Sequence, residues 1–488
     1  MTSLDPHRRW LALYVLCAGV LMIVLDTTIV TVALPSIRAD LRFTETSLVW
    51  VVNAYMLTYG GFLLLGGRLG DLYGHRRLFL AGLVLFTAAS LACGLSTAQI
   101  PLIAARAAQG VGGAVVTAVA LSLIMDLFTA DADRAKAMAI YGFTCSGGGA
   151  LGALLGGVLT SAVNWHAIFL VNIPIGTAAY FACLRMIPRD RVDARATRLD
   201  VAGAITITVS LLLAVYAVVN GNEAGWTSGE TLSLFGGAIA LLVAFIAIES
   251  RVAQPLVPLA MFRLRNIIVA NIVGVLWAAG MFAWFFISAL YLQLVLGYDP
   301  FQVGIAFVPS DLVMAAFSVS WSAKIVTRFG LRAPAAAGLL IAGAGLALFA
   351  RAPVDGGYWL DVFPGMILLG IGAGVAFNPV LLAAMSDVEQ KDSGLASGIV
   401  NTSFMMGGSL GLAVLAAIAA ARTGPSLNAE TLTAGYHLAF VVGAIFVAVA
   451  AALCYLIRQR TPAAPSTSSV NPAPSERPMT ESFMKANV

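Results

Sequence analysis

The feature that most constrains the fold of this chain is a series of long apolar runs. A helix of about 20 apolar residues crosses the hydrocarbon core of a bilayer. Fourteen such runs lie near residues 10–34, 48–66, 78–97, 100–127, 136–162, 167–187, 200–219, 231–249, 267–293, 303–326, 333–350, 360–385, 394–421 and 434–457. The sequence therefore predicts an all-α polytopic membrane protein with fourteen transmembrane helices.

Composition narrows the class of function. Only 11% of the 488 residues are charged, whereas a soluble domain has about 25%. The net charge of +4 is small, so we expect no nucleic-acid partner. The cysteines all fall in apolar runs without CxxC spacing, and no histidine has a partner at metal-ligand spacing, so we expect no disulfide framework and no metal. The GxxxxGK[ST] phosphate loop is absent from the sequence. We therefore expect no cofactor, and a proton gradient instead of ATP as the energy source.

Basic residues predict the orientation in the membrane. One set of loops carries most of the arginines and lysines, whereas the other carries only Arg38, Arg42, Arg351 and Arg422. Because cytoplasmic loops are enriched in Lys and Arg, we expect both termini to be cytoplasmic in a multi-pass protein of the plasma membrane, in contact with membrane lipid.

An internal repeat organises the chain. Gly74 and Gly330 follow similar basic loops at an offset of 256 residues, and paired glycines of the fourth and twelfth spans recur at an offset of 260: Gly110 and Gly112, then Gly370 and Gly372. Parallel repeats of this kind are typical of secondary transporters. We predict two six-helix bundles at 1–190 and 267–460, two inserted central helices with a cytoplasmic linker at 191–266, and a disordered tail at 461–488.

Asp26 is the most unusual residue of the first span. An aspartate at the centre of a membrane helix costs about 2.5 to 3.5 kcal/mol and usually faces a protein interior or a cavity. Counted from the outer face, Asp26 lies about eight residues deep and Arg106 about six. We therefore predict that they pair, either for function or only as a structural ion pair.

The loop GRLGDLYGHRR, from Gly67 to Arg77, resembles the cytoplasmic signature of the major facilitator superfamily. LDTTIVTVALP, around Asp26, and WHAIFLVNIPIG, from Trp165 to Gly176, resemble motifs of its fourteen-spanner drug/proton antiporter family. The resemblance covers nearly the whole chain. It implies a role in conformational gating for five signature positions, which are Gly67, Asp71, Gly74, Arg76 and Arg77.

The same resemblance assigns roles within the membrane spans. It implies proton coupling by Asp26 and proton transfer through Arg106, in ARAAQGVGG. SGGGALGALLGG resembles the antiporter motif of the fifth span, which is thought to seal the two halves; its glycines are Gly148, Gly152, Gly156 and Gly157. Ala153 stands where the family usually has proline, which weakens the inference of export. Small residues at this spacing also simply allow helices to approach closely.

The second half has less regular candidates. Asp311 lies about eight residues into the tenth span, either as a second proton or cation site or hydrogen-bonded near Pro309. Phe404 and Met405 stand where the family commonly has an Arg-Gln pair, so they suit an apolar substrate pocket or ordinary packing. Other candidates for the cavity are the polar residues Asn53, Tyr55, Gln109, Asn271, Gln293, Asn378 and Asn401, each of which could equally make an interhelical hydrogen bond.

The resemblance implies a proton-coupled secondary transporter that exports amphipathic or cationic organic compounds by alternating access. Within transport, two alternatives are a dedicated exporter of one metabolite, antibiotic or siderophore, and a proton symporter. A membrane-embedded enzyme or receptor would need a catalytic cluster or a signalling domain, and the sequence shows neither. We expect a monomer that binds a small organic substrate and protons; the need for an envelope adaptor stays open.

Overall fold

The computed structural model describes residues 6–128, 130–187, 200–252, 255–388, 393–424 and 428–458. Within these ranges every regular element is helical, which confirms the predicted fold class. The tail predicted at 461–488 lies outside the described residues.

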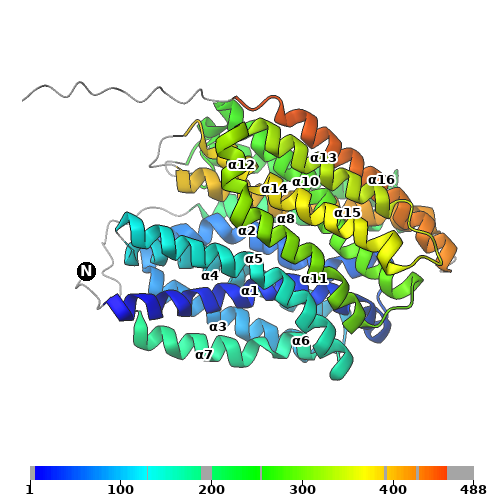
Figure 1. Cartoon of the computed structure of the whole chain (residues 1–488), viewed down its shortest axis with the longest axis horizontal. Coiled ribbons are helices and arrows are strands. Elements are labelled where there is room, and N and C mark those ends of the chain that lie inside the picture. Colours follow the sequence, from blue (N-terminus) through cyan, green and yellow to red (C-terminus); the bar gives the residue numbers. More distant parts are fainter. Residues whose placement is uncertain are drawn as a thin grey trace, which may run out of the picture.

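One group of helices comes from the N-terminal part of the chain (Figure 1). Helix α4 packs against α2 and α3, and α1 packs against α5 and α7. The group comprises α1 (Pro6–Leu41), α2 (Glu45–Tyr73), α3 (His75–Gly94), α4 (Gln99–Leu127), α5 (Asp131–Ala162), α6 (Ala167–Leu170) and α7 (Asn172–Met186).

A second group comes from the C-terminal part and lies beside the first (Figure 1). Helix α10 packs against α15 and α16, and α14 packs against α11 and α13. The α-helices are α10 (Arg265–Leu290), α11 (Pro300–Ala316), α12 (Ser322–Phe329), α13 (Arg332–Phe349), α14 (Phe363–Met385), α15 (Ser393–Thr423) and α16 (Ala429–Cys454). Three π-helical turns interrupt this group: η2 (Tyr291–Val295), η3 (Phe317–Trp321) and η4 (Tyr358–Val362).

The inserted pair consists of α8 (Val201–Ala224) and α9 (Gly229–Glu249). Helix α8 contacts α2 of the first group and α15 of the second. Its Asn222 side chain donates a hydrogen bond to the carbonyl of Ala417. Helix α9 is mostly exposed, and its exposed residues are large and apolar, as expected for a helix that faces lipid. The linker that follows contains a short 3₁₀ helix, η1 (Leu259–Arg263).

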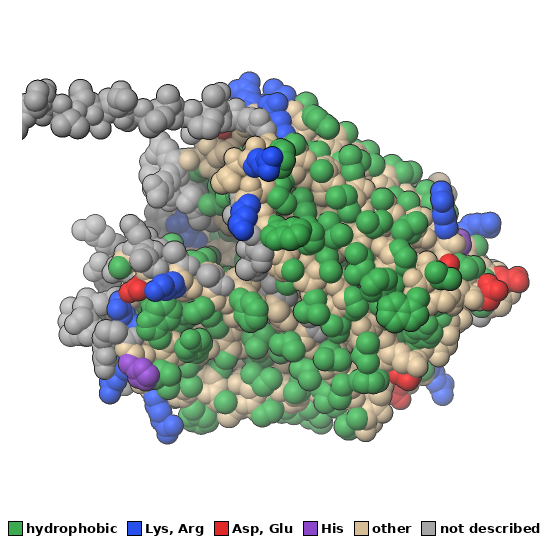
Figure 2. All heavy atoms as spheres, viewed as in Figure 1, with side chains coloured by type: hydrophobic (Ala, Val, Ile, Leu, Met, Phe, Trp, Pro, Cys, Tyr) green, Lys and Arg blue, Asp and Glu red, His purple; other side chains and the backbone are tan. Residues whose placement is uncertain are grey.

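Thirteen helices are long and apolar enough to cross a membrane. The predicted tenth span, 303–326, begins as the shorter α11 and continues without a break through η3 into α12. Apolar side chains cover most of the visible face, whereas many of the charged side chains gather at its two ends (Figure 2). The protein is therefore a multi-pass membrane protein, in agreement with the apolar runs.

Helix α1 is longer than predicted. The sequence suggested an end near residue 34, whereas α1 continues through Pro35 to Leu41. Leu34 and Ile37 are fully buried, so tertiary packing outweighs the hydrogen bond that a proline removes. Asp26 consequently lies 15 residues (41 − 26) before the end of the helix, deeper than the predicted eight.

The predicted repeat is visible in the turns. Gly74 joins α2 to α3 with φ of 95°, and Gly330 follows α12 with φ of 74°. Positive φ is easily adopted only by glycine, so both halves use the same tight connection.

The repeat also appears where helices approach most closely. A Cβ atom at Gly110 would lie 2.3 Å from the carbonyl oxygen of Tyr55, and one at Gly370 would lie 2.4 Å from that of Ser310. The offset from Tyr55 to Ser310 is 255 residues, one less than at the turn. The π turn η3 lies between these points, and its hydrogen bonds span one more residue than those of an α-helix. It therefore accounts for the difference.

The two groups are packed together along α5 and α11. A Cβ atom at Gly157 would lie 2.6 Å from the carbonyl oxygen of Pro300, and one at Gly304 would lie 2.6 Å from that of Ala153. These contacts lie near the C-terminal end of α5. Closer to its N-terminal end, Cβ atoms at Gly147 and Gly149 would meet no atom within 4 Å. The seam is thus closed at the end of the molecule opposite the N-terminus of α1, and it is open toward the other end.

Candidate functional site

Asp26 and Arg106 form a buried ion pair between α1 and α4. Their side chains are 0% and 1% exposed, and Nη1 of Arg106 lies 2.5 Å from Oδ2 of Asp26. The structure therefore brings together the two residues that their similar depth predicted to pair.

Two amides complete the surroundings of the Asp26 carboxylate. Gln109 donates from Nε2 to Oδ1 at 2.7 Å, and Asn172 donates from Nδ2 to the same oxygen at 3.0 Å. Both amides also reach Ser90 Oγ, at 2.8 and 3.4 Å. Both carboxylate oxygens thus accept hydrogen bonds, and this arrangement stabilises the ionised form.

Arg106 has further partners of its own. Its Nε donates to the carbonyl of Val51 at 2.9 Å, and Nη1 also donates to Gln109 Oε1 at 2.6 Å. The guanidinium carbon lies 4.4 Å from the ring centroid of Tyr55 and 5.7 Å from that of Phe169. A cation over aromatic rings is electrostatically favourable, so Arg106 stays compensated even if it loses one partner.

Glycines of α5 pack against α1 on both sides of Asp26 along the chain. A Cβ atom at Gly148 would lie 2.8 Å from Val24, one at Gly152 would lie 2.7 Å from the Leu25 carbonyl oxygen, and one at Gly156 would lie 2.5 Å from that of Ile29. Three of the four predicted gating glycines thus hold α1 in place, and Gly157 makes the contact between the two groups described above.

Gly156→Ala is expected to lower the melting temperature of the purified protein. The new methyl group would press against the α1 backbone, and overpacking of this kind costs about 1 to 3 kcal/mol. Gly149→Ala is the matched control on the same helix, because its methyl group would enter open space and alanine favours the helix. Equal melting temperatures for the two variants would contradict the proposed packing role.

The signature loop binds within the first group of helices. Arg76 donates from Nη2 to the carbonyl of Leu184 at 2.8 Å, and His75 lies 3.2 Å from Asp126. Arg77 is exposed, and a Cβ atom at Gly67 would be in ordinary contact with Ala118. The side chain of Asp71 lies outside what the structure describes. The printed contacts of this loop join helices of one group, so its gating role stays a prediction.

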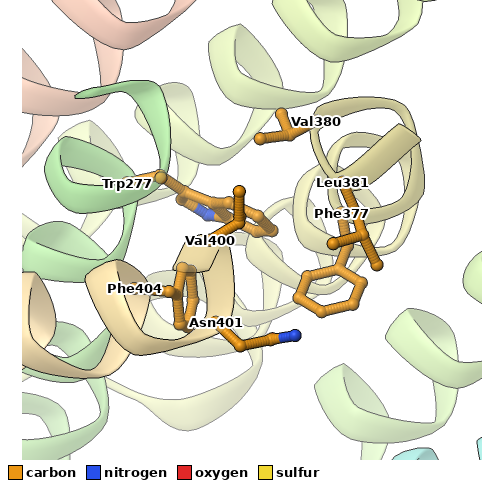
Figure 3. A pocket seen from close by; sticks show the side chains of 8 residues that line it. Trp277, Phe377, Val380, Leu381, Val400, Asn401 and Phe404 are labelled. Atoms are coloured by element: carbon orange, nitrogen blue, oxygen red, sulfur yellow. The ribbon is translucent and has the colours of Figure 1, made fainter. Parts of the chain in front are cut away.

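An aromatic pocket lies in the second group (Figure 3). Its rings come from three helices: Trp277 on α10, Phe377 on α14 and Phe404 on α15. The centroid of Phe404 lies 5.4 Å from that of Trp277 and 6.3 Å from that of Phe377. The other lining residues are Gly274, Val380, Leu381, Val400 and Asn401. Trp277 Nε1 is buried without a hydrogen-bond partner, so the pocket offers one free donor among apolar walls.

Two predicted cavity residues, Phe404 and Asn401, thus line this pocket, whereas others are placed differently. Gln109 is fully buried beside Asp26 and Tyr55 lies under Arg106, so both belong to the ion-pair cluster. Asn53 is also fully buried, and neither polar atom of its side chain has a partner.

The remaining predicted cavity residues lie at helix contacts. Gln293 donates to the carbonyl of Val32 at 2.9 Å and so bridges the two groups. Asn271 and Asn378 donate to the carbonyls of Ile267 and Ser318. Met405 lies where a Cβ atom at Gly60 would be 3.2 Å from it, at the contact between α2 and α15. Asp311 is buried on α11, and no printed contact joins it to Asp26.

Sequence reasoning missed Ser90 and Asn172. Asn172 belongs to WHAIFLVNIPIG, where a polar residue at the start of a membrane helix is a usable signal. Ser90 has no such signal, because serine is common in membrane helices and its partner is set by helix rotation.

Comparisons with known proteins agree with this architecture. A family model described as Major Facilitator Superfamily matches residues 16–412. The puromycin resistance protein pur8 of Streptomyces alboniger is 38% identical over 483 residues, which cover 96% of this chain and 95% of that protein. The cephamycin export protein CmcT of Amycolatopsis lactamdurans is 38% identical over 446 residues, 91% of each chain.

A solved structure supports the same fold. A mutant of the nucleoside transporter NupG superposes with a TM-score of 0.67 at 12% identity, over 92% of this chain and 100% of that chain. This chain therefore belongs to the major facilitator superfamily of membrane transporters.

Proposed function

We propose that this protein is a proton-coupled exporter of amphipathic or cationic organic compounds. The observation that carries export is the similarity, over at least 91% of the chain, to relatives named for antibiotic resistance and export. The observation that supports proton coupling is the buried Asp26–Arg106 pair, because an ionisable side chain within a membrane helix is a default candidate for a proton relay.

The proposed setting is the plasma membrane with both termini in the cytoplasm, as the distribution of basic loops indicates. In this orientation, the closed seam at Gly157 and Gly304 faces outward and the open part near Gly149 faces the cytoplasm. The conformation would therefore be ready to take substrate from the cytoplasm. The proposed unit is a monomer that needs no cofactor.

The proposed cycle alternates the charge of Asp26. A proton that enters from outside neutralises the carboxylate and weakens its hold on Arg106, which keeps its bonds to Val51 and Gln109. Loss of that proton to the cytoplasm restores the pair, while substrate moves the other way. The driving force is sufficient, because each charge that crosses the membrane is worth about 2.3 kcal/mol per 100 mV.

The aromatic pocket is the proposed contact for the apolar part of the substrate. Gly274→Leu should fill it, because a Cβ atom there would meet nothing within 4 Å. We expect the KM for efflux to rise about tenfold, or about 1.4 kcal/mol, with little change in melting temperature. Gly236→Leu on α9, which also has open space around it, is the control. An unchanged KM would remove the pocket from the substrate path.

A second candidate is a dedicated exporter of one antibiotic, because both relatives are named for a single compound. A panel of puromycin, cephamycin, lincomycin and cationic dyes, tested in a host that lacks its own pumps, separates the two. Resistance to several unrelated compounds supports the broad exporter, and resistance to one supports the dedicated one. Resistance to none, with the protein shown to be in the membrane, would contradict both.

A further inference from the structure

Asp311 is a second carboxyl group inside the membrane, and its surroundings differ from those of Asp26. It lies on α11, is 2% exposed, and its Oδ2 atom has no hydrogen-bond partner. Asp26 accepts hydrogen bonds from Arg106, Gln109 and Asn172. An ionised carboxylate is very costly to bury without such donors, whereas a neutral carboxylic acid is much less so.

No described cation compensates Asp311. The charged or titratable side chains on the elements packed against α11, and on η4 beside it, make no printed contact with it. On described residues these are Tyr14, Cys17, Asp26, Arg38 and Asp40 on α1, with His7, Arg8 and Arg9 at its start; Asp133, Lys136 and Tyr141 on α5; Tyr291 in η2; and Tyr358 and Asp361 in η4. Only a bound proton can neutralise the Asp311 carboxylate in these surroundings.

The repeat shows where Asp311 lies relative to the two groups. Before the π turn, the offset of 255 residues makes Asp311 the counterpart of Met56. Met56 lies at the contact between α2 and α15, where a Cβ atom at Gly408 would be 3.2 Å from it. Asp311 should therefore occupy the matching contact, between α11 and α5.

Helix geometry agrees with this position. Asp311 follows Gly304 by seven residues, which is two helical turns, so it lies on the same face of α11. Gly304 packs against Ala153 in the closed seam, and α5 has open space around Gly149 and Gly147, four and six residues before Ala153. Asp311 thus lies where the closed part of the seam gives way to the open part.

We propose that Asp311 is a second proton-binding site, which is occupied in this conformation while Asp26 is ionised. Its proton would be taken up from outside when the seam opens to that side, and it would cross the membrane as part of a neutral acid. Each cycle would then carry two protons, one in each group of helices. The occupancy of Asp311 stands independently, whereas its share in coupling rests on the proposed function.

Infrared spectroscopy of the full-length protein in lipid at neutral pH tests the occupancy directly, without any substrate. Wild-type protein should show the carbonyl band of a buried protonated carboxyl group. Asp311→Asn should lose that band, and Asp26→Asn should keep it. A band that persists unchanged in Asp311→Asn would overturn the proposal.

A stability measurement covers the case in which the asparagine variant misfolds. Asp311→Leu replaces a neutral acid with an apolar group of similar size, so its melting temperature should equal or exceed that of the wild type. A clear drop in melting temperature would instead indicate a compensated charge at Asp311 and would contradict the proposal.

Coupling is tested in proteoliposomes with puromycin as the probe. The pH gradient that just stops net flux should correspond to two protons per puromycin for the wild type and to one for Asp311→Asn. Equal ratios would exclude Asp311 from coupling. If wild-type protein moved no puromycin, that result would count against the proposed function and leave the infrared result standing.

Discussion

Asp26→Asn is expected to reduce efflux driven by a pH gradient to the background of empty membranes, while substrate still binds. Asparagine has nearly the same shape and can still accept hydrogen bonds from Gln109 and Arg106, but it cannot take up or release a proton. Binding of substrate to purified protein and gradient-driven efflux should therefore separate in this variant. The two assays, run on the same preparation, check the prediction.

Asp40→Asn is the matched control, because Asp40 lies on the same helix near its outer end. Its side chain is 56% exposed and accepts a hydrogen bond from Trp165. This variant should keep gradient-driven efflux. If Asp26→Asn kept it as well, Asp26 could not be the coupling residue, and its ion pair would have a structural role only.

Arg106→Met is expected to destabilise the protein by about 3 to 5 kcal/mol, the cost of leaving one member of a buried ion pair uncompensated. Asp26 would then retain only the neutral amides of Gln109 and Asn172. The reverse change, Asp26→Asn, should cost less, because Arg106 keeps Val51, Gln109 and the Tyr55 ring. Denaturation of the purified variants measures both.

The double variant Asp26→Leu/Arg106→Met should recover much of the stability that Arg106→Met loses. Replacing both charges by apolar groups removes the uncompensated carboxylate, and such replacements are often close to neutral. It should not recover gradient-driven transport. A double variant as unstable as Arg106→Met alone would show that the loss comes from packing and not from charge.

The apolar runs predicted the helices well because the cost of exposing backbone polar groups to lipid leaves few alternatives. The same physics made Asp26 stand out, since a charge in a membrane helix needs a compensating partner. Its pairing with Arg106 could be predicted from depth alone. The turn at Gly74 could be predicted as well, because only glycine readily adopts its positive φ.

Other parts of the site depend on helix rotation, which a single sequence does not contain. Gln109 was expected at the cavity but faces Asp26, and Ser90 and Asn172 entered the cluster without being expected. The end of α1 was misplaced because local reasoning stops a helix at Pro35, whereas packing around Leu34 and Ile37 carries it onward. In each case the deciding contact comes from a helix far away in the sequence.

The most direct test of proton-coupled export is transport by purified protein in proteoliposomes with a fixed pH gradient. The account predicts that puromycin, or the compound most active in the panel, moves against the direction of proton flow, and that reversing the gradient reverses the movement. Movement in the same direction as the protons would show symport. Movement that does not depend on the gradient would contradict proton coupling altogether.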